Sequence, residues 1–260
     1  MQASGNDFVV VDNRKKIIPD AHRFTQKVCA PHTGIGADGV LLFENSKKAD
    51  FRMRIINSDG SEAEACGNGF RCIALYARKV FHYPDEFRFE SESGIIQARL
   101  RNKRVRVQLV TPSEIRLQDE IDVLGHRLHY AFINTGVPHT VVFVEGLEKI
   151  DVENLGRAVR RHKKFQPKGT NVNFAEVAGR NAIHVRTYER GVEKETLACG
   201  TGSTASAVIS ALSGYTEPPV KVKTQGSEIL TIDFKRKGNK ITEVTLEGEA
   251  HFVYEGKLLS

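Results

Sequence analysis

An internal duplication constrains this chain more than any other feature of its 260 residues. Residues 65–77 read ACGNGFRCIALYA, and residues 198–210 read ACGTGSTASAVIS. Alanine, cysteine, two glycines and a second alanine stand at matching places in both segments. The apolar residues after each Cys-Gly-X-Gly sequence are typical of a buried helix. A repeat of this kind predicts that the chain is built from two copies of one structural unit.

Further segments match in the same order in both halves of the chain. They are small-Gly turns followed by apolar strands, and runs of alternating apolar and polar residues after each expected helix. Such alternation is typical of half-buried strands joined by a turn. The matched pairs are 4–13 with 135–146, 36–43 with 169–177, and 94–110 with 227–248.

The repeats predict an α/β (α+β) protein of two similar units, each mostly β with one helix that opens at Cys-Gly-X-Gly. We expect a pseudo-twofold axis to relate them. The first unit is placed at residues 1–114, with Cys66, and the second at 115–260, with Cys199, because Pro112 punctuates the segment between them. The last strand, at about 250–260, could instead pack back on the first unit.

Composition excludes several classes of protein. Apolar residues make up 40% of the chain, and no stretch approaches the roughly 20 apolar residues that span a bilayer. The N-terminal segment has no basic stretch typical of a signal peptide. The net charge of +6 includes basic runs at 101–106 and 157–164, which we interpret as solvated faces because no nucleic-acid motif accompanies them. We expect a cytoplasmic protein that binds neither membranes nor nucleic acids.

The four cysteines predict neither a disulfide framework nor a metal site. Disulfide frameworks belong to small secreted chains, and no two cysteines have Cys-X-X-Cys spacing. We interpret Cys29 and Cys72 as small buried hydrophobic residues. Cys66 and Cys199 differ from them, because each stands immediately before the glycines of a repeat.

The Cys-Gly-X-Gly sequences indicate a site for acid–base chemistry. A helix N-terminus has free N–H groups and a positive dipole end, so it binds carboxylates and lowers the pKa of a nearby thiol. Two such ends that face one cleft would place a thiol on either side of an α-carbon, as inversion of a stereocentre requires. This chemistry needs no metal or pyridoxal cofactor. A phosphate loop is disfavoured because the GxxxxGK[ST] pattern is absent.

At this level of detail the chain resembles the diaminopimelate epimerase family. The resemblance rests on SGNDFVVVD, HTGIGADGVLLF, INSDGSEAEACGNGFRC, NTGVPH, GTNVNF and YERGVEKETLACGTGSTAS, which run in order from residue 4 to about 206. It implies two domains, each a β-barrel-like sheet around a central helix, with the active site in the cleft between them. It also implies cofactor-independent interconversion of LL- and meso-2,6-diaminopimelate, a step toward lysine and peptidoglycan, with Cys66 and Cys199 as the acid–base pair.

The resemblance implies roles for further residues. His139 and Glu189 match positions near the reacting centre and count as catalytic. The residues implied to bind substrate are Asn6, Asn57, Gly67, Asn68, Asn171, Glu189, Arg190, Gly200 and Thr201. Without the resemblance, an Asn after Gly reads as a turn residue, His139 as a loop histidine, and Glu189 with Arg190 as an exposed pair.

One departure leaves the substrate open. Many members of the family have Asn where Val137 stands, and valine can neither donate nor accept a hydrogen bond. The nearest alternative is therefore a histidine, proline or hydroxyproline type of racemase on the same scaffold. A non-catalytic binding protein and a nucleic-acid module are weaker alternatives. The expected partner is a small molecule, with a homodimer also open.

Overall fold

The computed structural model describes residues 1–238 and 240–258. The chain forms two units. Unit 1 comprises Met1–Gln108 and the C-terminal segment from Glu247, and unit 2 comprises Leu109–Leu246. No helix among the described residues is long and apolar enough to cross a membrane.

Unit 1 is a mixed sheet with two helices. Its elements are β1 (Gln2–Ala3), β2 (Asn6–Asp12), α1 (Ala21–Val28), β3 (Gly39–Glu44), β4 (Phe51–Asn57), β5 (Glu62–Ala63), α2 (Gly67–Val80), β6 (Glu86–Ser91), β7 (Gly94–Arg101) and β8 (Arg104–Gln108). Strands β2 and β3 are parallel, as are β4 and β6. The pairs β1–β2, β3–β4, β6–β7 and β7–β8 are antiparallel, and β5 adds to β4.

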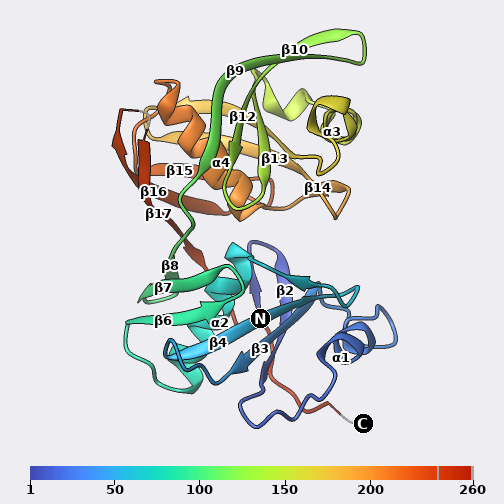
Figure 1. Cartoon of the computed structure of the whole chain (residues 1–260), viewed down its shortest axis with the longest axis vertical. Helices are drawn as coiled ribbons and strands as arrows, with labels where there is room; N and C mark the ends of the chain where they lie inside the picture. Colours follow the sequence, from blue (N-terminus) through green and yellow to red (C-terminus); the bar gives the residue numbers. More distant parts are fainter. Residues whose placement is uncertain (239, 259–260) are drawn as a thin grey trace. The chain divides into compact units, whose positions relative to one another are not determined.

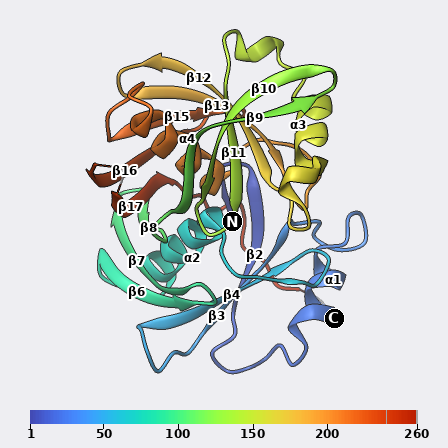
Figure 2. The same cartoon turned by 45° about the horizontal axis from the view of Figure 1, so that its top comes forward.

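Helix α2 is the centre of unit 1, and strands surround it in both views (Figures 1 and 2). It contacts β1, β2 and β3 near one end of the strand order and β7 and β8 at the other, so the sheet curves around it. Nine consecutive residues, Gly67–Leu75, are buried. A helix buried on all sides belongs in a core. Cys66 immediately precedes α2, so the packing of this helix within the sheet fixes the position of Cys66 in unit 1.

Unit 2 has the same plan. Its elements are β9 (Ser113–Val123), β10 (His126–Asn134), β11 (Pro138–Phe143), η1 (Leu147–Lys149), α3 (Val152–Arg161), η2 (Lys163–Phe165), β12 (Asn171–Gly179), β13 (Ala182–Glu189), β14 (Lys194–Thr196), α4 (Gly200–Leu212), β15 (Val220–Thr224), β16 (Ile229–Lys237) and β17 (Lys240–Glu249). Every residue of α4 except Thr201 is buried, and α4 contacts β10, β11, β12, β13, β15 and β16.

The pairing of the strands repeats between the units. Strands β11 and β12 are parallel, like β2 and β3, and β13 and β15 are parallel, like β4 and β6. The pairs β12–β13 and β15–β16 are antiparallel, like β3–β4 and β6–β7, and β14 adds to β13 as β5 adds to β4. The predicted fold class, with a sheet around one central helix in each unit, is confirmed.

The strands of unit 2 separate two faces. Val172, Phe174 and Tyr188 join a hydrophobic cluster with Val152 and Val159 of α3. Because side chains alternate along a strand, residues between these positions, such as Asn173 and Thr187, point to the other face. Asn173 indeed lies against Gly202 of α4. The α4 face of β12 and β13 therefore carries the polar groups beside Cys199.

The ends of the units differ in detail from the sequence-based expectation. The first unit ends at Gln108, before residue 114, because Ser113–Val123 form β9 and pair with β10 of unit 2. Strand β1 is only two residues long. Residues 250–258 form no strand apart from a bridge between His251 and Gln2, which attaches this segment to unit 1, and residues 259–260 lie outside the described part.

Candidate active site

Both predicted thiols cap a central helix. Cys66 precedes α2 in an extended conformation, and its Sγ accepts a hydrogen bond from the Gly69 N–H at 3.4 Å. Cys199 precedes α4 in the same way, and its Sγ accepts from the Gly202 N–H at 3.4 Å. This is the N-cap position, where a side-chain acceptor satisfies an orphan N–H of the first turn. A thiolate at this position would interact favourably with the helix dipole.

Asparagine side chains surround Cys66. Its Sγ lies 3.6 Å from Asn6 Oδ1, and Asn68 Nδ2 lies 3.5 Å from the same oxygen. Asn6 Nδ2 donates to Asp38 Oδ2 at 2.6 Å. These contacts bring the predicted residues Asn6, Gly67 and Asn68 together with Cys66 in unit 1.

The buried side chain of Arg71 hydrogen-bonds to the residues around Cys66. Arg71 is 0% exposed, and its Nη2 donates to Asn68 Oδ1 at 3.1 Å and to the Ser4 hydroxyl. Because a guanidinium only donates and an ionised carboxylate only accepts, Arg71 and Asp38 fix the orientations of the two amides between them. Asn6 Oδ1 then faces the Cys66 thiol.

Cys199 has a hydroxyl neighbour in unit 2. Its Sγ lies 3.4 Å from Thr201 Oγ1, and the Thr201 carbonyl accepts a hydrogen bond from Thr135 Oγ1 at 3.3 Å. Thr201 is the one residue of α4 that is not buried. The predicted residues Gly200 and Thr201 therefore form the first turn of α4 beside the thiol.

His139 lies at the start of β11 and is completely buried. Burial, together with the positive charge of Arg190, lowers the pKa of His139 to about 3. Asn173 Nδ2 lies 3.2 Å from His139 Nδ1. The parallel pairing of His139 with Asn171 places it within the sheet, so the loop interpretation, which applied only without the family resemblance, does not hold.

Asn171 connects the other predicted residues of unit 2. Its Nδ2 donates to the Pro138 carbonyl at 3.0 Å, and its Oδ1 accepts from the Arg190 N–H at 2.9 Å. The guanidinium of Arg190 donates to the Lys168 carbonyl at 3.1 Å. Glu189 Oε2 accepts from Thr196 Oγ1 at 3.0 Å. The amide of Asn171 thus fixes the backbone from which Arg190 projects.

Asn57 and Val137 occupy turns. Asn57 ends β4, is exposed, and donates from Nδ2 to Ser61 Oγ at 3.0 Å within a tight turn. The Val137 carbonyl accepts from the Thr135 N–H at 3.1 Å between β10 and β11. No described contact joins Asn57 to the group around Cys66.

Cys29 and Cys72 lie in hydrophobic surroundings. Both are buried and neither forms a disulfide, and burial raises the pKa of Cys29 to about 11. Cys72 faces the core from within α2. A thiol with a raised pKa is a poor nucleophile.

Sequence reasoning missed three residues that contact the predicted site residues: Asp38 and Arg71 in unit 1, and Asn173 in unit 2. Asn173 could have been found, because Asn171 and Asn173 in GTNVNF are two residues apart and must share one face of a strand. Asp38 and Arg71 carry no comparable signal. Their contacts depend on the pairing of β2 with β3 and on the packing of α2.

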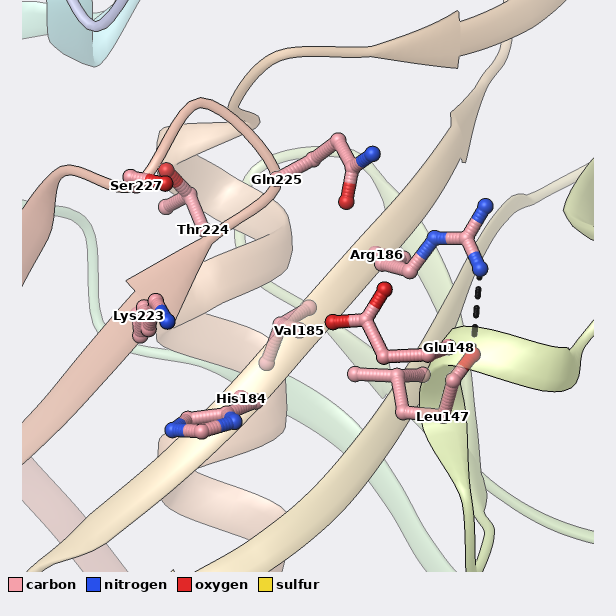
Figure 3. A pocket seen from close by; sticks show the side chains of 9 residues that line it. All are labelled: Leu147, Glu148, His184, Val185, Arg186, Lys223, Thr224, Gln225 and Ser227. Atoms are coloured by element: carbon pink, nitrogen blue, oxygen red, sulfur yellow. Dashed lines mark hydrogen bonds between the residues drawn. The ribbon is translucent and has the colours of Figure 1, made fainter.

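A hollow of about 240 Å³ lies elsewhere on unit 2 (Figure 3). It contains none of the predicted site residues. Its guanidinium, Arg186, is bound to Glu195 at 2.7 Å and to the Leu147 carbonyl at 3.0 Å. The lining residues are Leu147, Glu148, His184, Val185, Arg186, Lys223, Thr224, Gln225 and Ser227.

Comparison with known proteins decides the family. The sequence profile described as Diaminopimelate epimerase matches residues 1–113 and 131–253. This chain belongs to the diaminopimelate epimerase family. The diaminopimelate epimerase of Aquifex aeolicus is 47% identical over 99% of this chain and 96% of its own length, and that of Chlorobaculum tepidum is 39% identical over 99% of both. As a member of this family, the chain is an isomerase.

Solved structures support the diaminopimelate epimerase fold. A phenazine biosynthesis protein of the PhzF family from Bacillus anthracis has a TM-score of 0.72 at 16% identity, covering 100% of this chain and 95% of its own. A probable proline racemase from Agrobacterium radiobacter has a TM-score of 0.70 at 16% identity, covering 95% and 88%. At such low identity, these structures show the fold alone.

Proposed function

We propose that this chain interconverts LL- and meso-2,6-diaminopimelate without a cofactor, with Cys66 and Cys199 as its two acid–base groups. The observation that carries this proposal is the matched pair of thiols at the N-caps of α2 and α4. Membership of the diaminopimelate epimerase family supports the choice of substrate.

The reaction requires both thiols to act on one α-carbon from opposite faces. One thiolate removes the α-proton and becomes a thiol, while the electron pair of the C–H bond moves into the carboxylate to give an enediolate-like species. The other thiol then delivers its proton to the opposite face and becomes a thiolate. N–H groups at Gly67, Asn68, Gly200 and Thr201 would stabilise the negative charge on the carboxylate.

The distal end of the substrate carries an ammonium group and a second carboxylate. We assign the second carboxylate to Arg190, because a guanidinium binds a carboxylate through two parallel hydrogen bonds. Asn171 supports this role by accepting from the Arg190 N–H. Asn6 and Asn57 offer donors and acceptors for the remaining polar groups. Glu189 is assigned to the reacting centre or to the ammonium group.

The direct test is incubation with LL-diaminopimelate in deuterated water, followed by chiral separation and mass spectrometry. We expect meso product with one deuterium at the inverted carbon. Absence of both inversion and α-deuterium would contradict the proposal. A chelator should leave turnover unchanged, since two thiols suffice for the chemistry, whereas restoration of lost activity by an added metal would contradict this part.

Substrate choice is tested by comparing kcat/KM for LL-diaminopimelate, L-histidine, L-proline and L-lysine. We expect diaminopimelate to be strongly preferred, because the other three lack a second carboxylate for Arg190. Arg190→Lys keeps the charge but loses the planar fork, so it should impair turnover severely. Losing one partner of such a contact costs about 2–5 kcal/mol. Preference for any of the other three would favour the related racemase, the alternative that Val137 leaves open.

Two further assignments accompany this function. We place the enzyme in the cytoplasm, where thiols stay reduced, because the proposed chemistry needs two free thiols. Whether it forms a homodimer is a separate prediction, which light scattering on the purified chain would test.

A further inference from the structure

His139 and Asn173 form a buried polar contact that the acid–base scheme above does not use. Both side chains are 0% exposed. Asn173 Nδ2 lies 3.2 Å from His139 Nδ1, while His139 Nε2 has no hydrogen-bond partner among the described residues. One nitrogen of the ring is therefore occupied, and the other is buried and available.

The orientation of the Asn173 amide is fixed by its other contacts. Nδ2 lies 3.0 Å from the Thr140 carbonyl, which can only accept a hydrogen bond, so the amino group must be on this side. Oδ1 accepts from Thr187 Oγ1 at 3.0 Å. One hydrogen of Nδ2 therefore serves Thr140, and the second points at His139 Nδ1.

A donor facing Nδ1 requires that Nδ1 carries no proton. In a neutral imidazole the proton then resides on Nε2. Burial favours the neutral form, and Arg190, the charged group that acts on this ring, favours it further. We propose that Asn173 is a positioning residue that holds His139 as the Nε2–H tautomer, so that His139 serves the reaction as a hydrogen-bond donor and not as a base.

This inference rests on the proposed function only for the identity of the acceptor. A buried N–H without an acceptor is unfavourable, so Nε2–H is suited to an anionic oxygen that arrives with the ligand. The carboxylates of diaminopimelate provide such oxygens. A neutral donor also adds no positive charge that would have to be buried in the free enzyme.

The second glycine of the CGTG segment allows this contact. A Cβ at Gly202 would overlap Asn173 Oδ1 and lie 3.3 Å from Cys199 Cβ. The amide of Asn173 therefore packs directly against the helix turn that Cys199 caps. At the matching glycine of unit 1, Gly69, the nearest side-chain atoms belong to Leu41 and Met53, both 3.3 Å away. An asparagine side chain therefore packs against the second glycine of the helix start in unit 2, but not in unit 1.

The test is long-range 1H–15N correlation spectroscopy on ligand-free enzyme labelled with 15N-histidine, with His139→Gln to assign the ring. We expect the Nε2–H pattern for His139 in the wild type. Asn173→Asp replaces the donor with an acceptor, so the proton should move to Nδ1, and kcat should fall at least tenfold. Thr187→Val leaves the Thr140 contact in place and should keep the wild-type tautomer. Thr216→Val, which removes a buried hydroxyl bonded to Ser210, is the control and should change neither the tautomer nor kcat.

The wild-type spectrum alone can overturn the proposal. A Nδ1–H pattern, or protonation of His139 near the ordinary pH of a histidine, would refute it even if Asn173→Asp fails to fold. An unchanged kcat in a folded Asn173→Asp enzyme with a flipped tautomer would refute the donor role. Failure of the proposed function is distinguished by wild-type enzyme that shows the Nε2–H pattern but does not epimerise diaminopimelate.

Discussion

At the scale of single residues, Cys66 and Cys199 stand where helices usually carry Ser, Thr, Asp or Asn. Each sulfur accepts an N–H from the third residue of its helix. The same contact that caps the helix would stabilise a thiolate, because the N–H and the dipole favour negative charge there. The sulfur atom of each cysteine therefore has two roles, as the helix cap and as the proposed acid–base group. Only a substitution that keeps one role and removes the other can separate them.

Serine separates the two roles. Cys66→Ser and Cys199→Ser should keep the helix cap but reduce turnover by orders of magnitude, because a hydroxyl is a far weaker acid than a thiol. Alanine should abolish turnover and also cost about 0.5–2 kcal/mol of stability through the lost cap. Urea unfolding and deuterium exchange at the α-carbon measure the two effects. Cys72→Ala is the control, and near-normal activity of either Ser variant would refute the two-thiol mechanism.

Alkylation provides an independent test of the remaining thiols. With a pKa of about 11, Cys29 is ionised to roughly one part in a thousand at pH 8, and its side chain is buried. Peptide mass spectrometry after brief treatment with iodoacetamide should show Cys29 and Cys72 unmodified while activity is lost. Loss of activity that follows modification of Cys29 would contradict this expectation.

At the scale of elements, the two helix N-termini have different neighbours. Gly202 lies against the fixed amide of Asn173, whereas Gly69 lies against the flexible ends of Leu41 and Met53. An added methyl group can be accommodated where a side chain can shift, but not where a buried amide already has its hydrogen bonds.

Gly202→Ala should therefore be more harmful than Gly69→Ala. We expect a loss of about 1–3 kcal/mol and a large fall in kcat for Gly202→Ala, from overpacking against Asn173. Gly69→Ala should be milder in stability, partly because alanine favours a helix. Urea unfolding with parallel kinetics checks both variants. Equal effects in the two units would show that the Asn173 contact does not control this position.

A carboxylate links β9 to the short helix η2. The Lys164 ammonium, the Glu120 N–H and the Tyr130 hydroxyl hydrogen-bond Asp119 and lower its pKa to about 2. Because the folded value lies below the unfolded value of about 3.9, this carboxylate stabilises the fold above pH 4, and the contribution is lost as the pH falls toward 2. Lys164→Met should flatten the acid limb of a stability–pH curve measured by urea unfolding. An unchanged acid limb would contradict the assignment, and Lys163→Met is the control.

The scale of elements also shows what the sequence could predict. The duplicated Cys-Gly-X-Gly segments predicted two helix N-termini, because capping and glycine content are local properties. The contacts of Asn173 with His139 and of Arg71 with Asn68 depend on which strands pair and on how one buried helix is rotated. Local patterns do not encode these choices, and the position of His139 within the sheet depends on the same pairing of strands.

At the scale of the whole molecule, unit 1 is discontinuous in sequence. Its C-terminal segment is attached by Glu247, which binds Arg104 at 2.6 Å and Arg106 at 3.0 Å, and by the bridge between His251 and Gln2. Burial alone would raise the pKa of Glu247, but the hydrogen bonds from Arg104 and Arg106 outweigh it and lower the value. Glu247 is therefore held as a carboxylate between two guanidinium groups.

Glu247→Gln should loosen this attachment. The amide would leave two guanidinium groups with a weaker acceptor, so the Gln2 and His251 N–H groups, which bond to each other's carbonyls at 2.9 Å, should exchange faster with deuterium. Amides of α4 in unit 2 should be unaffected. The exposed Glu255→Gln is the control. Unchanged exchange at Gln2 and His251 would contradict the role of Glu247.

The discontinuity of unit 1 has a consequence for the nascent chain on the ribosome. Unit 2 is one continuous segment, Leu109–Leu246, so its last residue is translated before the segment that completes unit 1, which begins within β17 at Glu247. The bridge between Gln2 and His251 cannot form until the intervening chain has been synthesised. Domains usually fold in order of synthesis, N-terminal first. Here the second unit can complete its native contacts while the first is still open at its edge, which makes the earliest synthesised half the last to be finished.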